Sequence, residues 1–358
     1  MRLGIDGRKI PEAAKRGGVA SMDHGKELGM DGLFFRTVLD VTPTLDPGAL
    51  KAVRQRADEL GMYVEMGLGK VNPYALPETP EMRAIGDGDT LLGFRRMMEA
   101  CAAIDCRELW VGTANHKDYP GRFGTDRFRT DVTWADQLEG IQKLLLLLKP
   151  IALDLGIHIN IETHEEITSF EVVRLVEACG PDAFGIVYDT NNGLQRLEHP
   201  IWVAKRVAPY TRQTHFKDSG VIFNGRTAAM QSRPCGQGVV DYAAILKILA
   251  AAQPELNITI ENSPPNEGGP KFVKFNKLEL AEPAFIAAHP DCTVEEYADF
   301  VDMIHAYEKR IAEGDVPPLV EEVRDFDYAA AVRDILSSRD HLRGICEDLN
   351  LPLRKRAA

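Results

Sequence analysis

Eight short apolar runs alternate along the chain with longer segments in which apolar residues recur at helical spacing. The runs are rich in Ile, Val, Leu and Phe, which is typical of strands buried on both faces of a parallel sheet. The spacing from run to run, roughly 25 to 50 residues, fits a unit of one strand and one helix. The predicted strands are Arg2–Asp6, Gly32–Arg36, Met62–Gly67, Glu108–Thr113, His158–Thr163, Gly185–Asp189, Gln213–Lys217 and Asn257–Glu261. The clearest predicted helices are Pro47–Leu60, Gly93–Ile104, Ala135–Leu155 and Phe170–Cys179.

Eight such units in order favour an α/β fold of the (β/α)8 TIM barrel type over an open, doubly wound sheet. An open sheet that binds a dinucleotide would carry a glycine-rich loop after its first strand, and the turn Gly4–Arg8 lacks that pattern. We expect the barrel to span residues 1–263. Residues 264–358 are expected to complete the same domain, as an irregular cover over the barrel mouth and a C-terminal extension with helices at Thr293–Glu313 and Asp327–Asp348.

Net charge narrows the range of partners. The 358-residue chain has 54 acidic and 42 basic residues, a formal charge of −12, whereas binding to a phosphate backbone needs a basic face. No run of about 18 apolar residues is present, so a membrane partner is not expected either. The six cysteines form no CxxC pair, which favours free thiols in a reducing compartment. We therefore expect a cytoplasmic protein with a small-molecule substrate.

Metal-competent side chains stand at the ends of four consecutive predicted strands. Catalytic residues of such barrels lie at the carboxyl ends of the strands, so these side chains should meet at one mouth. A lone carboxylate there is usually solvated or caps a helix, but several buried together without a cation would be costly. Three carboxylates and one imidazole suit Mn²⁺, Mg²⁺, Fe²⁺ or Co²⁺. The predicted metal ligands are Glu162, Asp189, His215 and Glu261.

Further polar residues are expected to face the same mouth and to bind substrate. For each of them alone, an ordinary salt bridge or loop hydrogen bond is the competing interpretation. The candidate substrate-binding residues are Arg36, Glu65, Asn115, His116, Asn192 and Arg233.

The strand-end motifs INIET, VYDTNN, THFKD and ITIEN resemble those of the xylose isomerase-like barrel superfamily of sugar isomerases and epimerases. The loop Pro234–Asp241 resembles the Gly-x-Gly-x-x-Asp stretch that follows the seventh strand in that superfamily. The resemblance implies a TIM barrel in which the four predicted ligands hold one divalent ion, Mn²⁺ above the others. One departure matters: Asn192 stands where many of those isomerases and epimerases have a histidine, and His164 follows the first ligand by two residues.

A narrower resemblance covers LGIDGRKIPEA, FFRTVLDVTPTLD, MEACAAIDCRELWVGTAN and IETHEEITSFEVVRLVE. These segments are similar to carbon–carbon lyases of the superfamily: the α subunit of C-glycoside deglycosidases and the 3-oxo-isoapionate decarboxylases. The resemblance implies a metal-dependent lyase acting on a 3-oxo sugar through an enolate. In the deglycosidase case it also implies a small β subunit as partner, and a homo-oligomer is the other assembly considered.

Two residues are assigned catalytic roles within that mechanism. A base beside the 3-ketone would remove the C2 proton before an aglycone leaves, whereas loss of CO₂ from a 3-oxo acid gives the same kind of enolate without a base. His164 is the first choice for the base because imidazole titrates near neutral pH, and orienting Glu162 is its competing role. Lys217 is expected to stabilise negative charge, unless it simply pairs with Asp218.

Three other functions are alternatives to the lyase. A metal-dependent sugar isomerase or ketose 3-epimerase would need a second proton-transfer group, for which Glu65 or His116 could serve. A metal-dependent endonuclease would need more histidine ligands and a basic groove. A sugar-binding protein without catalysis would not need four metal-competent side chains.

Overall fold

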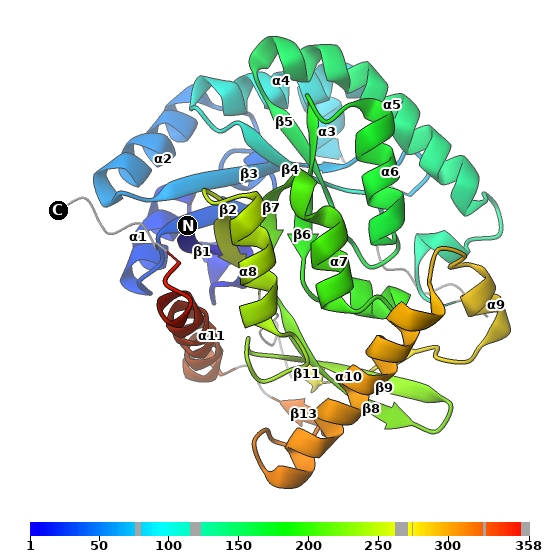
Figure 1. Cartoon of the computed structure of the whole chain (residues 1–358). Coiled ribbons are helices and arrows are strands. Elements are labelled where there is room, and N and C mark those ends of the chain that lie inside the picture. Colours follow the sequence, from blue (N-terminus) through cyan, green and yellow to red (C-terminus); the bar gives the residue numbers. More distant parts are fainter. Residues whose placement is uncertain (76–79, 115–122, 262–270, 274, 325–326, 352–358) are drawn as a thin grey trace.

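A computed structural model describes residues 1–75, 80–114, 123–261, 271–273, 275–324 and 327–351 (Figure 1). Eight parallel strands lie in the order β10-β1-β2-β3-β4-β5-β6-β7. Their residues are apolar on both faces because one face points into the barrel and the other packs under helices. The strands are β1 (Arg2–Asp6), β2 (Gly32–Phe35), β3 (Tyr63–Lys70), β4 (Glu108–Gly112), β5 (His158–Glu162), β6 (Phe184–Asp189), β7 (Thr211–His215) and β10 (Asn257–Ile260).

The sheet closes between β7 and β10 through Phe216, the residue after β7. Phe216 N donates to Thr259 O at 2.7 Å, and Glu261 N donates to Phe216 O at 2.9 Å, in parallel pairing. The predicted TIM barrel is therefore confirmed. Closure places the end of β7 directly beside the end of β10, as the predicted site requires.

Helices surround the barrel, with apolar faces turned inward against the strands. Their ends follow local sequence signals: Thr168 and Glu171 form a capping box at the start of α6, and Gly61 and Gly156 end α2 and α5 in the left-handed conformation. The helices are α1 (Gly18–Glu27), α2 (Pro47–Leu60), α3 (Pro80–Ile85), α4 (Thr90–Ala103), α5 (Trp134–Leu155), α6 (Ser169–Cys179), α7 (Pro200–Val207), α8 (Tyr242–Ala252), α9 (Pro283–Ala287), α10 (Val294–Glu313) and α11 (Tyr328–Asp348).

The helix α11 completes the outer ring. It packs against α8, and two of its arginines reach the turn after α1: Arg339 donates to Leu28 O at 2.6 Å and Arg343 donates to Gly29 O at 2.5 Å. The helix predicted as part of a C-terminal extension thus occupies the place of the eighth barrel helix.

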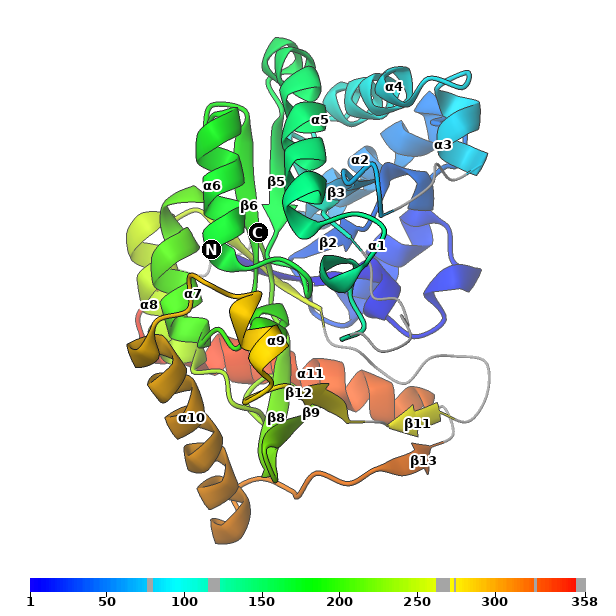
Figure 2. The same cartoon turned by 90° about the vertical axis from the view of Figure 1, so that its right-hand side faces the viewer.

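A small sheet follows β7, and it was not predicted from the sequence. Strands β8 (Asp218–Asn224) and β9 (Thr227–Arg233) form a hairpin, and β12 (Asn276–Leu278) pairs with β9. Figure 2 shows this sheet and α10 together on one side of the barrel, where Val221, Met230 and Phe300 share an apolar cluster.

The segment after β10 is not wholly irregular, contrary to the prediction. Besides β12 and α9, its described part contains β11 (Lys271–Val273), which pairs with β13 (Glu322–Arg324). Among the described residues, no helix is both long and apolar enough to cross a membrane.

One buried carboxylate ties this sheet to the barrel. Asp218 accepts backbone N–H bonds from Ser219, Gly236, Gly238 and Val240, at 2.9 to 3.1 Å. The loop that follows β9 is thereby folded back onto the first residue of β8. Because Asp218 lies three residues after His215, this arrangement also fixes the backbone that leaves the end of β7.

Candidate metal centre

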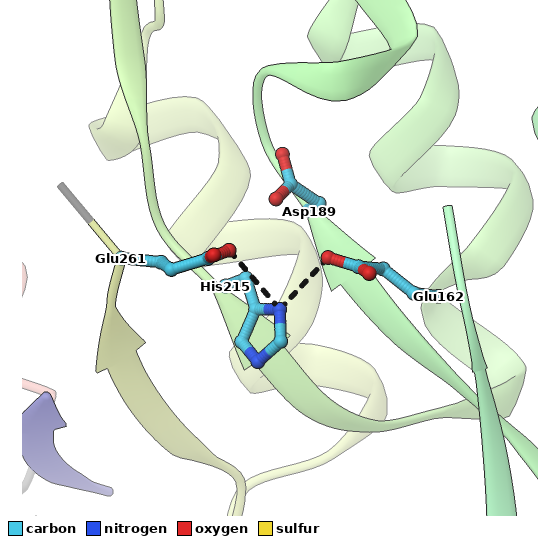
Figure 3. A group of neighbouring side chains, drawn as sticks. All are labelled: Glu162, Asp189, His215 and Glu261. Carbon is cyan, nitrogen blue, oxygen red and sulfur yellow. Dashed lines mark hydrogen bonds and ion pairs between the residues drawn. The ribbon is translucent and has the colours of Figure 1, made fainter. Parts of the chain in front are cut away.

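Four side chains converge at the carboxyl ends of adjacent strands (Figure 3). Glu162 ends β5, Asp189 ends β6, His215 ends β7 and Glu261 directly follows β10. One ligand atom from each lies within 4.8 Å of the others, and all four residues are buried. Nδ1 of His215 lies 2.9 Å from Oε1 of Glu162 and 3.3 Å from Oε2 of Glu261. The structure thus brings together all four predicted ligands.

Lys217 supplies positive charge to this cluster. Its Nζ lies 2.9 Å from Oδ2 of Asp189 and 3.1 Å from Oε2 of Glu261. Burial raises the pKa of Asp189 to about 6 against the pull of Lys217. Burial also opposes ionisation of Glu261, but the ammonium groups of Lys217 and Lys9 outweigh it and hold that pKa below its usual range. The competing pairing of Lys217 with Asp218 is not observed, since backbone N–H groups occupy both oxygens of Asp218.

The cluster fits a hard divalent cation. Oδ2 of Asp189 and Oε2 of Glu261 are buried and accept no hydrogen bond, so their contact with Lys217 leaves lone pairs without a donor. Carboxylate oxygens and one imidazole nitrogen are a donor set that such a cation prefers over thiolate-seeking ions. The remaining oxygen of Glu162 accepts a hydrogen bond from Nε1 of Trp110 at 2.9 Å, which fixes the orientation of that carboxylate. These four residues could hold one divalent ion.

His164 lies just outside the ligand set. Its Nδ1 bonds to Oε2 of Glu166, and Oε1 of the same carboxylate accepts from Thr113. Positive charge on His164 and the bond to it lower the pKa of Glu166 to about 2, although burial opposes the shift. The bond between Nδ1 and Glu166 fixes the orientation of the imidazole and leaves Nε2 on the far side of the ring. That nitrogen lies 3.9 Å from Oε2 of Glu162, on the side of the metal cluster.

The model of one protein family, described as "Xylose isomerase-like TIM barrel", matches residues 22–275. The chain belongs to this family. The match covers seven of the eight barrel strands and all four candidate ligands. Membership supports an enzyme, and the buried cluster of four residues could bind a divalent metal ion.

Two curated proteins are similar to parts of this chain. An uncharacterised Escherichia coli protein, YihM, is 31% identical over 93 residues, 26% of this chain and only 28% of YihM. The 3-oxo-isoapionate decarboxylase of Pectobacterium atrosepticum is 24% identical over 220 residues, which are 61% of this chain and 68% of the decarboxylase.

Among solved structures, two sugar epimerases share the fold of this chain. D-psicose 3-epimerase from Clostridium cellulolyticum, solved with D-tagatose, superposes with a TM-score of 0.63 at 13% identity, over 96% of this chain and 99% of the epimerase. The E. coli 3-keto-D-glucoside 4-epimerase YcjR gives a TM-score of 0.55 at 15% identity, over 86% and 99% of the two chains. At these identities the likeness extends to the fold alone.

The six predicted substrate-binding residues fall into three groups: two reach the ligand cluster, two do not, and two lie outside the described residues. Arg36 reaches the cluster, with NH1 3.3 Å from Oε1 of Glu261, and Asn192 does too, with Oδ1 3.3 Å from Nζ of Lys217. No hydrogen bond or ion pair joins Glu65 or Arg233 to the four candidate ligands. Asn115 and His116 lie outside the described residues.

Glu65 and Arg233 make contacts other than the ones expected of them. Glu65 lies deeper in the barrel, where Asn257 donates to it at 2.8 Å and Gln213 at 3.4 Å. It belongs to the middle of β3 because that strand continues to Lys70, three residues beyond its predicted end. Arg233 ends β9, where it pairs with Asp218, and its side chain donates to the carbonyl of Pro318 at 2.8 Å.

Several residues of the mouth were not predicted. Lys9 lies 3.5 Å from Oε1 of Glu261, and Lys70 lies 3.4 Å from Nε2 of His164. Glu166 was also not predicted as a residue of the mouth, although it follows His164 by two residues. Lys70 could have been found from the pair Gly69-Lys70, since a glycine at a strand end often marks an irregular, re-aimed backbone.

Proposed function

We propose that this protein is a divalent-metal-dependent lyase that cleaves a carbon–carbon bond of a 3-oxo sugar or 3-oxo sugar acid through an enolate. The observation that carries the proposal is the pairing of Glu166 with Nδ1 of His164, which turns the basic Nε2 toward the buried ligand cluster. The 24% identity with 3-oxo-isoapionate decarboxylase over 61% of the chain supports the same chemistry.

Each residue of the mouth has a role in such a reaction. When bound by Glu162, Asp189, His215 and Glu261, a divalent cation supplies positive charge that stabilises an oxyanion next to the reacting carbon. His164 moves a proton at that carbon through Nε2, and Glu166 holds the imidazole in the required tautomer. Asn192 offers a buried amide nitrogen that has no hydrogen-bond partner among the described residues, and it can donate to a substrate hydroxyl.

A paired assay tests this proposal. The purified chain is incubated with and without Mn²⁺, once with a 3-oxo C-glucoside and once with a 3-oxo sugar acid, and release of aglycone or CO₂ is measured. We expect Mn²⁺-dependent release from one of the two substrates. His164→Ala should abolish it, and His305→Ala, at an exposed histidine of α10, should not. If neither substrate reacts with Mn²⁺ present, the lyase proposal is wrong.

Assembly depends on which substrate reacts. Aglycone release would favour a deglycosidase α subunit with a small β subunit, and CO₂ release would favour a chain that acts without such a partner. Light scattering of the active preparation, compared with the mass of the single chain, distinguishes the two.

A sugar epimerase is the second candidate. Glu162 and Glu261 approach His215 from two sides, so two carboxylates could exchange a proton across one carbon (Figure 3). The Glu65 considered for this role lies elsewhere in the barrel. Incubation with Mn²⁺ and a ketohexose, followed by chromatography for inversion at C3, tests this function directly.

A further inference from the structure

Lys70 is a cation of the mouth that has no carboxylate partner within ion-pairing distance among the described residues. Its nearest polar contact is the 3.4 Å approach of Nζ to Nε2 of His164, and Nζ also lies 5.2 Å from the centroid of the Trp110 ring. The three other cations of the mouth differ: Lys9, Arg36 and Lys217 each pair with Glu261.

The backbone is shaped to place this ammonium. The pairing of β3 with β4 shifts register between Gly67 and Gly69, a bulge that re-aims the end of β3. Gly69 has φ of +111°, a conformation that favours glycine. On the neighbouring strand, a Cβ atom added to Gly112 would lie 2.5 Å from Nζ of Lys70, so glycine leaves the space that the ammonium fills.

Electrostatics leave this position in need of an anion. Burial lowers the pKa of Lys70 and the guanidinium of Arg36 adds repulsion, and together they outweigh the attraction of Glu166, Glu162 and Glu165. Arg36 lies 4.7 Å from the centroid of the same indole ring. Glu166 is already bonded to His164 and Thr113, and none of these nearby carboxylates forms an ion pair with Lys70. A negative group placed beside Lys70 would relieve both the burial and the repulsion.

We propose that Lys70 binds a carboxylate of the substrate, beside His164. This inference rests on the proposed function and narrows it to 3-oxo sugar acids. In the reaction, the bond between the carboxylate carbon and the carbon next to the ketone breaks, and CO₂ leaves. The electron pair stays on that carbon and the ketone oxygen as an enolate, and a proton from water, passed through Nε2 of His164, returns to the carbon.

The role of Lys70 is binding rather than bond breaking. The carboxylate loses its charge as CO₂ forms, so the contact with the ammonium weakens toward the transition state. Replacing Lys70 should therefore raise KM far more than it lowers kcat. A charge-assisted hydrogen bond of this kind corresponds to roughly a 10- to 100-fold change in affinity.

The test measures binding, so it does not depend on turnover. Calorimetry with Mn²⁺-loaded full-length protein compares D-erythronate and L-threonate, which carry a hydroxyl in place of the 3-ketone and cannot lose CO₂, with their amides. We expect one acid to bind at least about tenfold more tightly than its amide. Lys70→Met should remove this preference, and Lys70→Arg should keep part of it. Lys51→Met, the same change on the outside of the ring in α2, should leave it intact.

Equal affinity of the wild type for acids and amides would overturn the inference, even if the protein proves to be a lyase. An acid preference that survives in Lys70→Met would also overturn it. If that variant does not fold by circular dichroism, Lys70→Gln takes its place. An acid preference that depends on Lys70, without release of CO₂ or aglycone from any 3-oxo compound, would support the carboxylate site and reject the lyase.

Discussion

The two halves of the barrel mouth differ in charge and in construction. On one half, Glu162, Asp189 and His215 end β5, β6 and β7, and Glu261 directly follows β10. On the other half, Arg36 and Lys70 reach over the indole of Trp110 on long, flexible stems. The first half is suited to hold a cation in fixed geometry, and the second to bind an anion that arrives with the substrate.

Trp110 is the boundary between the halves. Its Nε1 donates to Glu162 on the acidic side, while its ring face attracts the two cations. Strand ends thus give precise placement, and long side chains give adaptable recognition. Four changes test this division.

The largest expected effect comes from removing a ligand of the acidic half. Glu162→Gln or Glu261→Gln should lose both the bound metal and the activity, by about 10³-fold or more, because the oxyanion would no longer be stabilised. Elemental analysis and the CO₂ or aglycone assay check this. Glu139→Gln, at an exposed position of α5, is the control. Full metal content in both ligand variants would show that the cluster is not the metal site.

Removal of the base should separate chemistry from metal binding. His164→Ala should retain the metal and lower turnover by about 10²- to 10⁴-fold, the usual contribution of a general acid–base group. Metal content and kcat are measured on the same preparation. A variant that turns over normally would reduce His164 to a residue that orients Glu162.

The support beneath the acidic half can be weakened at Asp218. In Asp218→Asn one oxygen becomes an NH₂ group, which leaves two of the four backbone N–H donors without an acceptor, a cost of about 2–4 kcal/mol. Asp241→Asn is the matched control, since Asp241 accepts only one N–H, at the start of α8, and asparagine caps equally well. Calorimetric melting should show a clear drop in Tm for the first variant, and equal Tm values would argue against the proposed anchoring.

The smallest expected effect is a pH dependence. The pKa of Glu166 is about 2 in the folded protein, below the ordinary value of 4.5, so its ionised form stabilises the fold above pH 4.5 and this contribution is lost as pH falls toward 2. The stability difference between the wild type and Glu166→Gln should therefore shrink by about 1 kcal/mol between pH 7 and pH 3.5. Urea unfolding at both pH values measures it, and a constant difference would contradict the pairing with His164.

The acidic half could be predicted from the sequence and the basic half could not. Apolar runs mark the strands, and residues near the end of a run need only the barrel rule to be placed, which is how Glu162, Asp189, His215 and Glu261 were found. Lys70 was not predicted because its strand bulges at Gly67 and continues past the expected end. The strand end expected too early also put Glu65 at the mouth.

Other parts of the fold depend on contacts distant in sequence. The hairpin β8–β9 is an insertion that keeps Asp218 at its root, and neither its pairing nor the four bonds to Asp218 follow from periodicity. The position of α11 in the ring depends on arginines that meet Leu28 and Gly29 more than 300 residues earlier.

This last contact has a consequence for biosynthesis. The place between α8 and the end of α1 stays uncovered until residues 328–348 have left the ribosome, because α11 is made after the small sheet and α10. Contacts of such long range slow folding, and this uncovered place exposes apolar surface to other molecules. Nascent chains paused before α11 should therefore depend on chaperones to a degree that full-length chains do not.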